Sequence, residues 1–318
     1  MTLPGRCSER SRVLNRLPGL LIIAVLPIAA CTGVVGGATQ RSASPTAPRL
    51  AVALPSEVHD KARLVAGVKC DYPPFGYTDE SDNVVGYEID MVRHMAWYAF
   101  GDAGAVGLQC VASANRVSLL TAGKVDMIVA GMTYTAERAK TVGFSDPYLA
   151  ASGRLLVARD STIKQARDLA GKTVATLSGG VYATYLQKCV PQAQLLHVAA
   201  TADALMALRQ GRAQAFLQDD TLLVDIARNN PDLKVVGPGV DAGAWGVAVR
   251  PADPALKDWV DAALGQMRME DFNWKSLQRW ILDPAIREEF GKAVPRPRQS
   301  LTYNTGAPAT CPASPQGG

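Results

Sequence analysis

The chain has 318 residues, of which 48% are apolar and 19% are charged, so it can bury the core of one large or two medium domains. This composition excludes a disordered or low-complexity protein. The formal net charge is +4, which is too small and too scattered to indicate nucleic-acid binding.

The first 30 residues have the pattern of a bacterial secretory signal. Four arginines precede an uncharged run from Leu17 to Ala30, which is shorter than the about 20 residues that a membrane-spanning helix needs. The run ends in two alanines followed by Cys31 and resembles the lipobox of bacterial lipoproteins. We therefore predict that residues 1–30 are removed and that Cys31 is lipidated, which anchors an extracytoplasmic protein to the bacterial cell membrane; an ordinary signal peptide with an incidental cysteine is the alternative.

Residues 31–56 are rich in Gly, Ala, Ser, Thr and Pro, a composition that predicts a flexible tether. From about residue 63 to residue 283, short β-branched runs alternate with longer helical ones. Strands are predicted at 64–69, 106–108, 125–130, 174–177, 195–198 and 213–217, and helices at 87–100, 180–188, 203–210 and 221–228. Further helices are expected from Pro254 to Leu282. Residues 293–318 show no helix or strand period and are predicted to form an irregular tail. Alternation of this kind indicates parallel α/β sheets, whose ligands bind beyond the carboxyl ends of the strands.

Four cysteines remain after the leader and Cys31, and three pairings are possible between Cys70, Cys110, Cys189 and Cys311. Cys70 and Cys110 each follow a predicted strand, and adjacent parallel strands would bring their ends within bridging range. This favours a Cys70–Cys110 disulfide and, by elimination, a Cys189–Cys311 disulfide. No CxxC spacing occurs and the three histidines are dispersed, so we expect no metal and no cofactor. The catalytic signatures of hydrolases, phosphate-loop enzymes and zinc proteases are missing from the sequence, so no catalytic residue is predicted.

Five blocks carry a family resemblance across residues 60–285: CDYPPFGY at 70–77, VGYEID at 85–90, LLTAGKVD at 119–126, AGMTYTAER at 130–138 and FSDPY at 144–148. In order and spacing they resemble the family 3 extracellular solute-binding proteins, the polar amino-acid receptors of ABC importers. The resemblance implies a periplasmic-binding-protein-like α/β fold with two lobes joined by two crossing strands. Lobe 1 would comprise 57–150 and 248–292, lobe 2 would comprise 155–243, and the hinges would lie near the β-like runs 154–158 and 245–249.

The same resemblance implies a set of ligand-binding residues. Arg138 stands where the family binds the ligand's carboxylate, and its planar fork suits a bidentate pair. The remaining positions are Gly131 and Thr133 for backbone and hydroxyl contacts, Val181 for a backbone N–H at a helix start, Asp219 for the ammonium group, and Tyr72 and Tyr87 as the aromatic pair that sandwiches the side chain. Asp220 beside Asp219 could be the helix cap, and a misalignment by one residue would exchange their roles.

Ligand preference is predicted from Lys69. Related receptors for basic or amide amino acids often have an aspartate at this position, three residues before Tyr72. A lysine attracts a carboxylate and repels a cation, which favours glutamate or aspartate, with glutamine or asparagine next; the alternative is a lysine that points into solvent.

These residues predict a monomeric, membrane-anchored receptor that delivers a free amino acid to an ABC transporter permease and binds no nucleic acid. Two other functions use the same fold: a dehydratase resembling cyclohexadienyl dehydratase and a sensory amino-acid-binding module.

Overall fold

The computed structural model describes residues 46–304 and residue 311, so the predicted signal peptide, Cys31 and residues 31–45 lie outside the described part. The elements in chain order are α1 (Ser56–His59), β1 (Leu64–Val68), β2 (Asp71–Tyr72), β3 (Gly76–Thr78), β4 (Val84–Val85), α2 (Tyr87–Phe100), β5 (Val106–Cys110), α3 (Arg116–Thr121), β6 (Met127–Val129), β7 (Gly143–Ala158), β8 (Thr173–Leu177), α4 (Tyr182–Cys189), β9 (Gln194–Val198), α5 (Thr201–Arg209), β10 (Ala215–Asp219), α6 (Asp220–Asn229), β11 (Leu233–Val249), α7 (Pro254–Met269), α8 (Phe272–Trp280) and α9 (Pro284–Gly291). Short 3-10 turns lie at Arg138–Lys140 and Ala166–Leu169.

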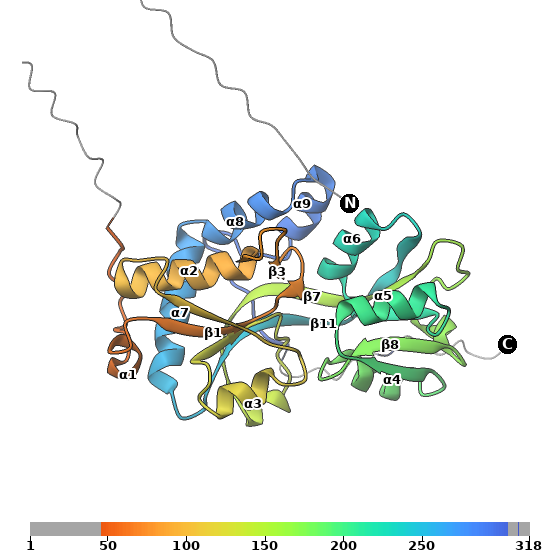
Figure 1. Ribbon diagram of the computed structural model, residues 1–318, viewed down its shortest axis with the longest axis horizontal. Coiled ribbons are helices and arrows are strands. Elements are labelled where there is room, and N and C mark those ends of the chain that lie inside the picture. The colour runs from red at the N-terminus through yellow and green to blue at the C-terminus, as the bar shows by residue number, and fades with distance from the viewer. Residues whose placement is uncertain (1–45, 305–310, 312–318) are drawn as a thin grey trace, which may run out of the picture. The chain divides into compact units, whose positions relative to one another are not determined.

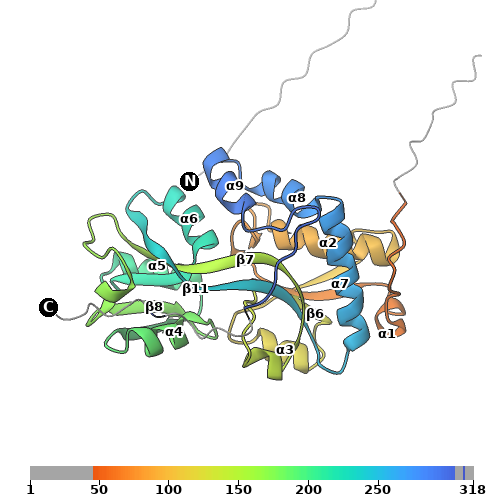
Figure 2. The same cartoon turned by 180° about the vertical axis from the view of Figure 1, so that it is seen from behind.

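Eight strands form one mixed sheet in the order β5-β1-β6-β11-β7-β10-β8-β9, and β2, β3 and β4 form a small second sheet. β1 is parallel to β5 and β6, and β8 is parallel to β9 and β10. β7 and β11, with 16 and 17 residues, are antiparallel to each other. Figures 1 and 2 show these two strands passing from the half that contains β1, α2 and α7 to the half that contains β8, α4 and α5. We call the first half lobe 1 and the second half lobe 2, and the two-lobed α/β fold expected from the sequence is confirmed.

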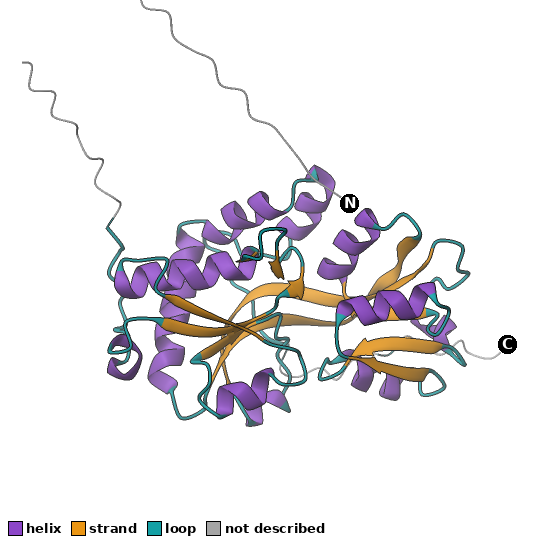
Figure 3. Ribbon diagram, in the orientation of Figure 1, coloured by secondary structure: helices purple, strands orange, loops and turns teal. Residues whose placement is uncertain are grey.

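Helices cover both faces of the sheet in each lobe (Figure 3), so the inner parallel strands β1, β6, β8 and β10 are buried on both sides, whereas the edge strands β5 and β9 are partly exposed. Helix α2 shows how the local sequence produces this arrangement. Ile89, Val92 and Met95 recur every three residues along one face and are almost completely buried. Gly101 ends the helix in the left-handed conformation with φ 72°, which costs glycine little because it has no Cβ.

Every strand and helix predicted between residues 64 and 228 is present, with ends that differ by two residues or fewer. The β-like runs 154–158 and 245–249 are the ends of β7 and β11, which are much longer than predicted. Helices α3 and α9 and the sheet of β2, β3 and β4 were not predicted. The strands of that sheet have two or three residues each, too few to produce a hydrophobic period.

The end of the predicted tether differs from the expectation. Leu50, Val52 and Leu54 are partly buried and pack against the main hydrophobic core, and α1 begins at Ser56. The prediction of a free tether is therefore wrong for residues 46–55. Composition alone hid the alternating apolar side chains, which can bury one side of an extended segment.

Two disulfides are present, Cys70–Cys110 and Cys189–Cys311, and they are the pairs that the sequence favoured. The register of β1 against β5 places Val68 beside Cys110. Cys70 lies two residues after Val68, so both cysteines are at the same end of two neighbouring parallel strands. Within the described residues no helix is both long enough and apolar enough to cross a membrane.

Candidate functional site

One cavity collects loops from both lobes at the carboxyl ends of their parallel strands. Its wall includes residues that follow β1, β5, β6 and β8 and the end of β10. The lining residues are Lys69, Tyr72, Ser113, Arg116, Ala130, Gly131, Thr133, Arg138, Gly180, Val181, Tyr182, Gln218 and Asp219. This is the edge at which α/β sheets bind ligands, because the loops there converge and their side chains are free of the strand ladder.

Asp219 is the acidic group of this cavity. Its carboxylate accepts hydrogen bonds from the hydroxyls of Tyr72 in lobe 1 and Tyr182 in lobe 2, each at 2.6 Å. Burial raises the pKa of Asp219 to about 6, although both tyrosine hydrogen bonds act in the opposite direction. The carboxylate retains lone pairs for a further donor, so it can still accept a ligand's ammonium group.

The neighbouring Asp220 has a different environment. It lies outside the cavity lining, accepts a hydrogen bond from the Ser152 hydroxyl at 2.6 Å, and accepts one from the Thr221 N–H at 2.8 Å. Asp219 is therefore the carboxylate that a ligand in the cavity would meet.

Arg138 joins the two lobes directly. Its Nη1 donates to the Thr133 carbonyl at 2.7 Å, and its Nη2 donates to the Gly179 carbonyl of lobe 2 at 2.8 Å. Burial, and then the charge of Arg116, lower the pKa of Arg138 to about 9, so the guanidinium remains charged at neutral pH. An arginine has five N–H donors, and those that remain can pair with a carboxylate at the same edge.

A buried polar network holds the backbone of Gly131. The Gly131 N–H donates to Glu88 at 2.8 Å, and Arg116 donates to the carbonyls of Ala130 at 2.5 Å and Gly131 at 3.3 Å. Tyr148 donates a short hydrogen bond to the same Glu88 oxygen. Gly131 has φ 54°, a conformation that glycine adopts at little cost, and the network keeps this turn at the cavity wall.

Arg116 has hydrogen-bonding capacity that the protein itself leaves unused. The residue is 3% exposed, lines the cavity, and has a buried Nε without a hydrogen-bond partner. Burial lowers the pKa of its guanidinium. A buried cation with unused donors is costly on its own and favours an anionic acceptor in the cavity.

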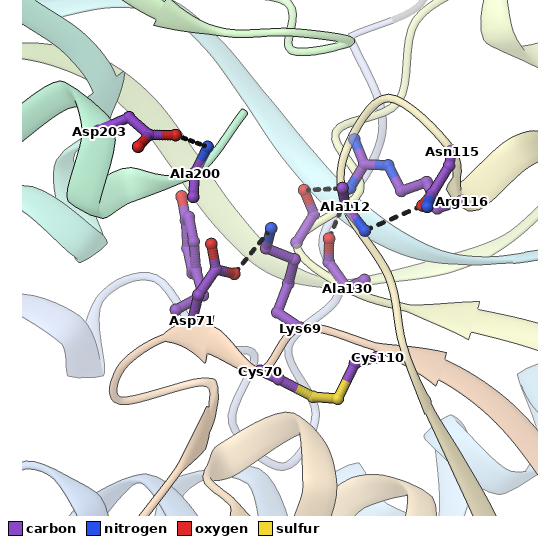
Figure 4. A network of polar contacts seen from close by, with 12 residues as sticks. Lys69, Cys70, Asp71, Cys110, Ala112, Asn115, Arg116, Ala130, Ala200 and Asp203 are labelled. Atoms are coloured by element: carbon purple, nitrogen blue, oxygen red, sulfur yellow. Dashed lines mark hydrogen bonds and ion pairs between the residues drawn. A yellow bond between two sulfur atoms is a disulfide. The ribbon is translucent and has the colours of Figure 1, made fainter. Parts of the chain in front are cut away.

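Lys69 lines the same cavity as Arg116, and Figure 4 shows its amino group directed toward Asp71. Lys69 is 2% exposed, and its Nζ is 2.9 Å from a carboxylate oxygen of Asp71, whose side chain is 38% exposed. Lys69 is therefore buried at the cavity, unlike a lysine that points into solvent. The adjacent Cys70–Cys110 disulfide fixes the segment that carries Lys69 to the end of β5.

Comparison with known proteins identifies the architecture. The family model described as bacterial extracellular solute-binding proteins, family 3, matches residues 64–283. The chain belongs to this family. A glutamine-binding protein of a Bacillus subtilis ABC transporter is 31% identical over 269 residues, which cover 83% of this chain and 96% of that protein. A glutamate/aspartate import solute-binding protein of Salmonella typhimurium is 28% identical over 70% of this chain and 77% of its own length.

Solved structures agree with this assignment. A cysteine-binding protein from Campylobacter jejuni superposes with a TM-score of 0.68 at 31% identity, over 72% of this chain and 92% of that one. The relatives are solute-binding proteins, so the present chain is a binding protein and not an enzyme.

This solute-binding protein places most of the predicted site residues together. Lys69, Tyr72, Gly131, Thr133, Arg138, Val181 and Asp219 all line the cavity. Val181 immediately precedes α4, so its backbone lies at the start of that helix.

Tyr87 is the exception. It is completely buried in lobe 1, its ring contacts Phe75 and Tyr148, and it is outside the cavity lining. Tyr87 is the first residue of α2, and that position directs its ring into the core. The structure therefore corrects the expectation that Tyr87 sandwiches the ligand opposite Tyr72.

The cavity also contains residues that the sequence did not reveal, chiefly Arg116 and Tyr182. Each is the first residue of a helix that begins a few residues after a parallel strand, which is the position from which side chains reach the carboxyl edge of a sheet. Neither matches a residue of the resemblance blocks, so only their position relative to the strands could have indicated them.

Proposed function

We propose that this protein is the lipid-anchored extracytoplasmic receptor that delivers an acidic amino acid, glutamate or aspartate, to an ABC permease, with glutamine and asparagine as weaker ligands. The observation that carries the proposal is the charge of the cavity wall. Three cations, Lys69, Arg116 and Arg138, line it together with one carboxylate, Asp219.

An acidic amino acid has the complementary charges, because it has two carboxylates and one ammonium group. Arg138, Thr133 and the backbone at Val181 would receive the α-carboxylate, and Asp219 would receive the ammonium group. Lys69 and Arg116 would receive the side-chain carboxylate. A pair of unit charges 4 Å apart is worth about 4 kcal/mol at an effective dielectric constant near 20, before the cost of desolvation.

The neighbouring acids reduce this positive field without removing it. Asp71 pairs with Lys69, and Glu88 lies behind Gly131, where one of its oxygens accepts hydrogen bonds from the Gly131 N–H and the Tyr148 hydroxyl and the other is buried without a partner. Burial raises the pKa of Glu88, which favours its neutral form. The unused donors of Arg116 therefore still favour a ligand that brings its own carboxylate.

The relatives support an amino-acid ligand and an importer as the partner. Their names cover glutamine, glutamate/aspartate, arginine and cystine as ligands, so the choice within the family depends on the cavity. Export and lipidation rest on the leader that ends before Cys31. We also propose the lobe limits given by the resemblance: residues 57–150 and 248–292 for lobe 1, and residues 155–243 for lobe 2.

Isothermal titration of the purified protein with glutamate, aspartate, glutamine, asparagine, arginine and cysteine tests the ligand. We expect glutamate or aspartate to bind most tightly. Lys69→Met and Arg116→Met should each reduce the preference for glutamate over glutamine by about tenfold, since one charge contact is removed. Lys257→Met is the matched control, because Lys257 pairs with Asp261 on α7, outside the cavity lining. Tight arginine binding with no response to the acidic amino acids would overturn the proposal.

A further inference from the structure

The strand position opposite Asp219 carries no side chain. Asp219 is the last residue of β10, and the antiparallel register of β10 against β7 pairs it with Gly153. Directly opposed residues of neighbouring strands present their side chains on the same face of the sheet. On its other side Gly153 is paired with Val240 of β11, so this glycine stands between two residues that have side chains. A glycine inside a strand often marks the close approach of another group.

The group that approaches Gly153 is the ring of Tyr182. A Cβ atom at Gly153 would collide with Cε1 of that ring and would lie 2.9 Å from its Cδ1. Tyr182 is 3% exposed and belongs to an apolar cluster that includes Leu155 of β7 and Leu217 of β10. The ring therefore has little room to move aside, and a side chain at position 153 would displace either the tyrosine or the crossing strand.

The same tyrosine directs its hydroxyl to Asp219. The Tyr182 hydroxyl donates to Oδ1 of Asp219 at 2.6 Å, and the Tyr72 hydroxyl of lobe 1 donates to Oδ2 at the same distance. One donor on each oxygen fixes the plane of the carboxylate. The Tyr182 bond is formed within lobe 2, between α4 and β10, so it does not depend on the position of lobe 1.

We propose that Gly153 and Tyr182 act together as positioning residues for Asp219. The glycine leaves the space in which the tyrosine ring lies, and the tyrosine hydroxyl fixes the carboxylate that accepts the ligand's ammonium group. This role rests on the proposed function as an amino-acid receptor. It applies to every α-amino acid, because all of them carry the ammonium group. A carboxylate that is already oriented loses less conformational freedom when the ligand binds.

The titration of Asp219 reports on the Tyr182 bond. The titratable groups around Asp219 are Tyr72, Arg116 and Arg138 from lobe 1 and Tyr182 and Asp220 from lobe 2. Burial raises the pKa of Asp219 to about 6, and the hydrogen bond from Tyr182 opposes this rise because it favours the ionised form. Loss of that bond should therefore raise the pKa of Asp219 further. A loss of packing alone at Gly153 would leave this pKa unchanged.

Carbon-13 NMR of the Asp219 carboxyl in the ligand-free protein tests the proposal without any assumption about the ligand. Tyr182→Phe removes the hydroxyl and keeps the ring, whereas Gly153→Ala displaces the ring. Both variants should raise the pH at which this carboxyl titrates. Gly153 does not have a positive φ, so alanine suits its backbone and the collision alone is tested. An unchanged titration in Tyr182→Phe would refute the positioning role.

Gly265→Ala on α7 is the matched control for the glycine replacement. A Cβ atom at Gly265 meets no atom within 4 Å beyond its own helix, so this variant should titrate as the parent does.

Thermal unfolding separates the collision from other effects of alanine and remains informative where Gly153→Ala is poorly stable. Gly153→Ala should lower the unfolding midpoint of the parent but not that of a Tyr182→Ala variant, in which the colliding ring is absent. An equal loss in both backgrounds would overturn the assignment of Gly153.

Isothermal titration with glutamate at pH 8 separates orientation from protonation, because Asp219 is then largely ionised in all variants. We expect binding by Tyr182→Phe and Gly153→Ala to be about three- to tenfold weaker than by the parent and by Gly265→Ala. Affinities equal to that of the parent would contradict the proposal. If glutamate binds none of the proteins, the proposed ligand is wrong, while the carboxyl titration still decides the positioning role.

Discussion

The affinity for any α-amino acid should fall steeply in mild acid, because Asp219 must be ionised to accept the ammonium group. Burial raises the pKa of this carboxyl from its usual value near 3.8 to about 6. Below that pKa the free protein carries a proton that must leave before the ligand binds. For one such group the apparent Kd rises about twofold at pH 6 and about tenfold at pH 5, relative to the ionised protein.

The contribution of Asp219 to folding stability depends on pH in the opposite direction to its contribution to ligand binding. Its pKa is higher in the folded protein than in the unfolded chain, so its contribution is fully present below about pH 4 and is lost as the pH rises through about 6. Acidification should therefore weaken ligand binding without loss of stability from this group. A protein that merely unfolded in acid would lose both together.

Isothermal titration with glutamate from pH 5 to pH 8, in two buffers that differ in ionisation enthalpy, measures both the affinity and the protons released. We expect release of nearly one proton per ligand at pH 5 and almost none at pH 7.5. Asp219→Asn should bind weakly and lose this pH dependence. Asp220→Asn is the matched control and should retain it, because Asp220 bonds Ser152 outside the cavity. A constant affinity across this range in the parent would refute the reasoning.

Three further outcomes are expected. Tyr87→Phe should bind as the parent does and be no less stable by thermal unfolding, because its buried hydroxyl has no hydrogen-bond partner; a large loss of affinity would restore its predicted role in the site. Replacing Cys70 and Cys110 together by serine should lower the midpoint of denaturant unfolding, with a loss of up to about 4 kcal/mol from the closure of a 40-residue loop, and an unchanged midpoint would contradict this. Cys31→Ala should release the protein from the membrane fraction or leave it as a precursor, whereas an unchanged mature mass with full membrane retention would exclude lipidation.

The alternative functions differ in what they require of the cavity. A dehydratase needs an acid placed to protonate a leaving hydroxyl, whereas both oxygens of Asp219 accept hydrogen bonds from tyrosines. A sensory module would use the same ligand site as a transport receptor. Permease and ATPase genes beside the coding sequence would distinguish import from sensing.

The local sequence was sufficient for the framework of the fold. The runs around β1, α2 and β8 have periods that distinguish strand from helix, and such periods depend only on residues close in the chain. The same reasoning favoured the Cys70–Cys110 disulfide, since the ends of neighbouring parallel strands must lie close together. It also placed Lys69 and Asp219 at strand ends, which is where this fold binds ligands.

Only the tertiary structure decided which of these side chains meet. Tyr72 and Asp219 are 147 residues apart and in different lobes, and no local period records their contact. The choice between Asp219 and Asp220 depended on which side of the chain faces the cavity at the junction of β10 and α6. Arg116 was identified as a cavity residue for the same reason. Side chains from separate segments come together through sheet register and lobe packing, and these depend on contacts between residues distant in sequence.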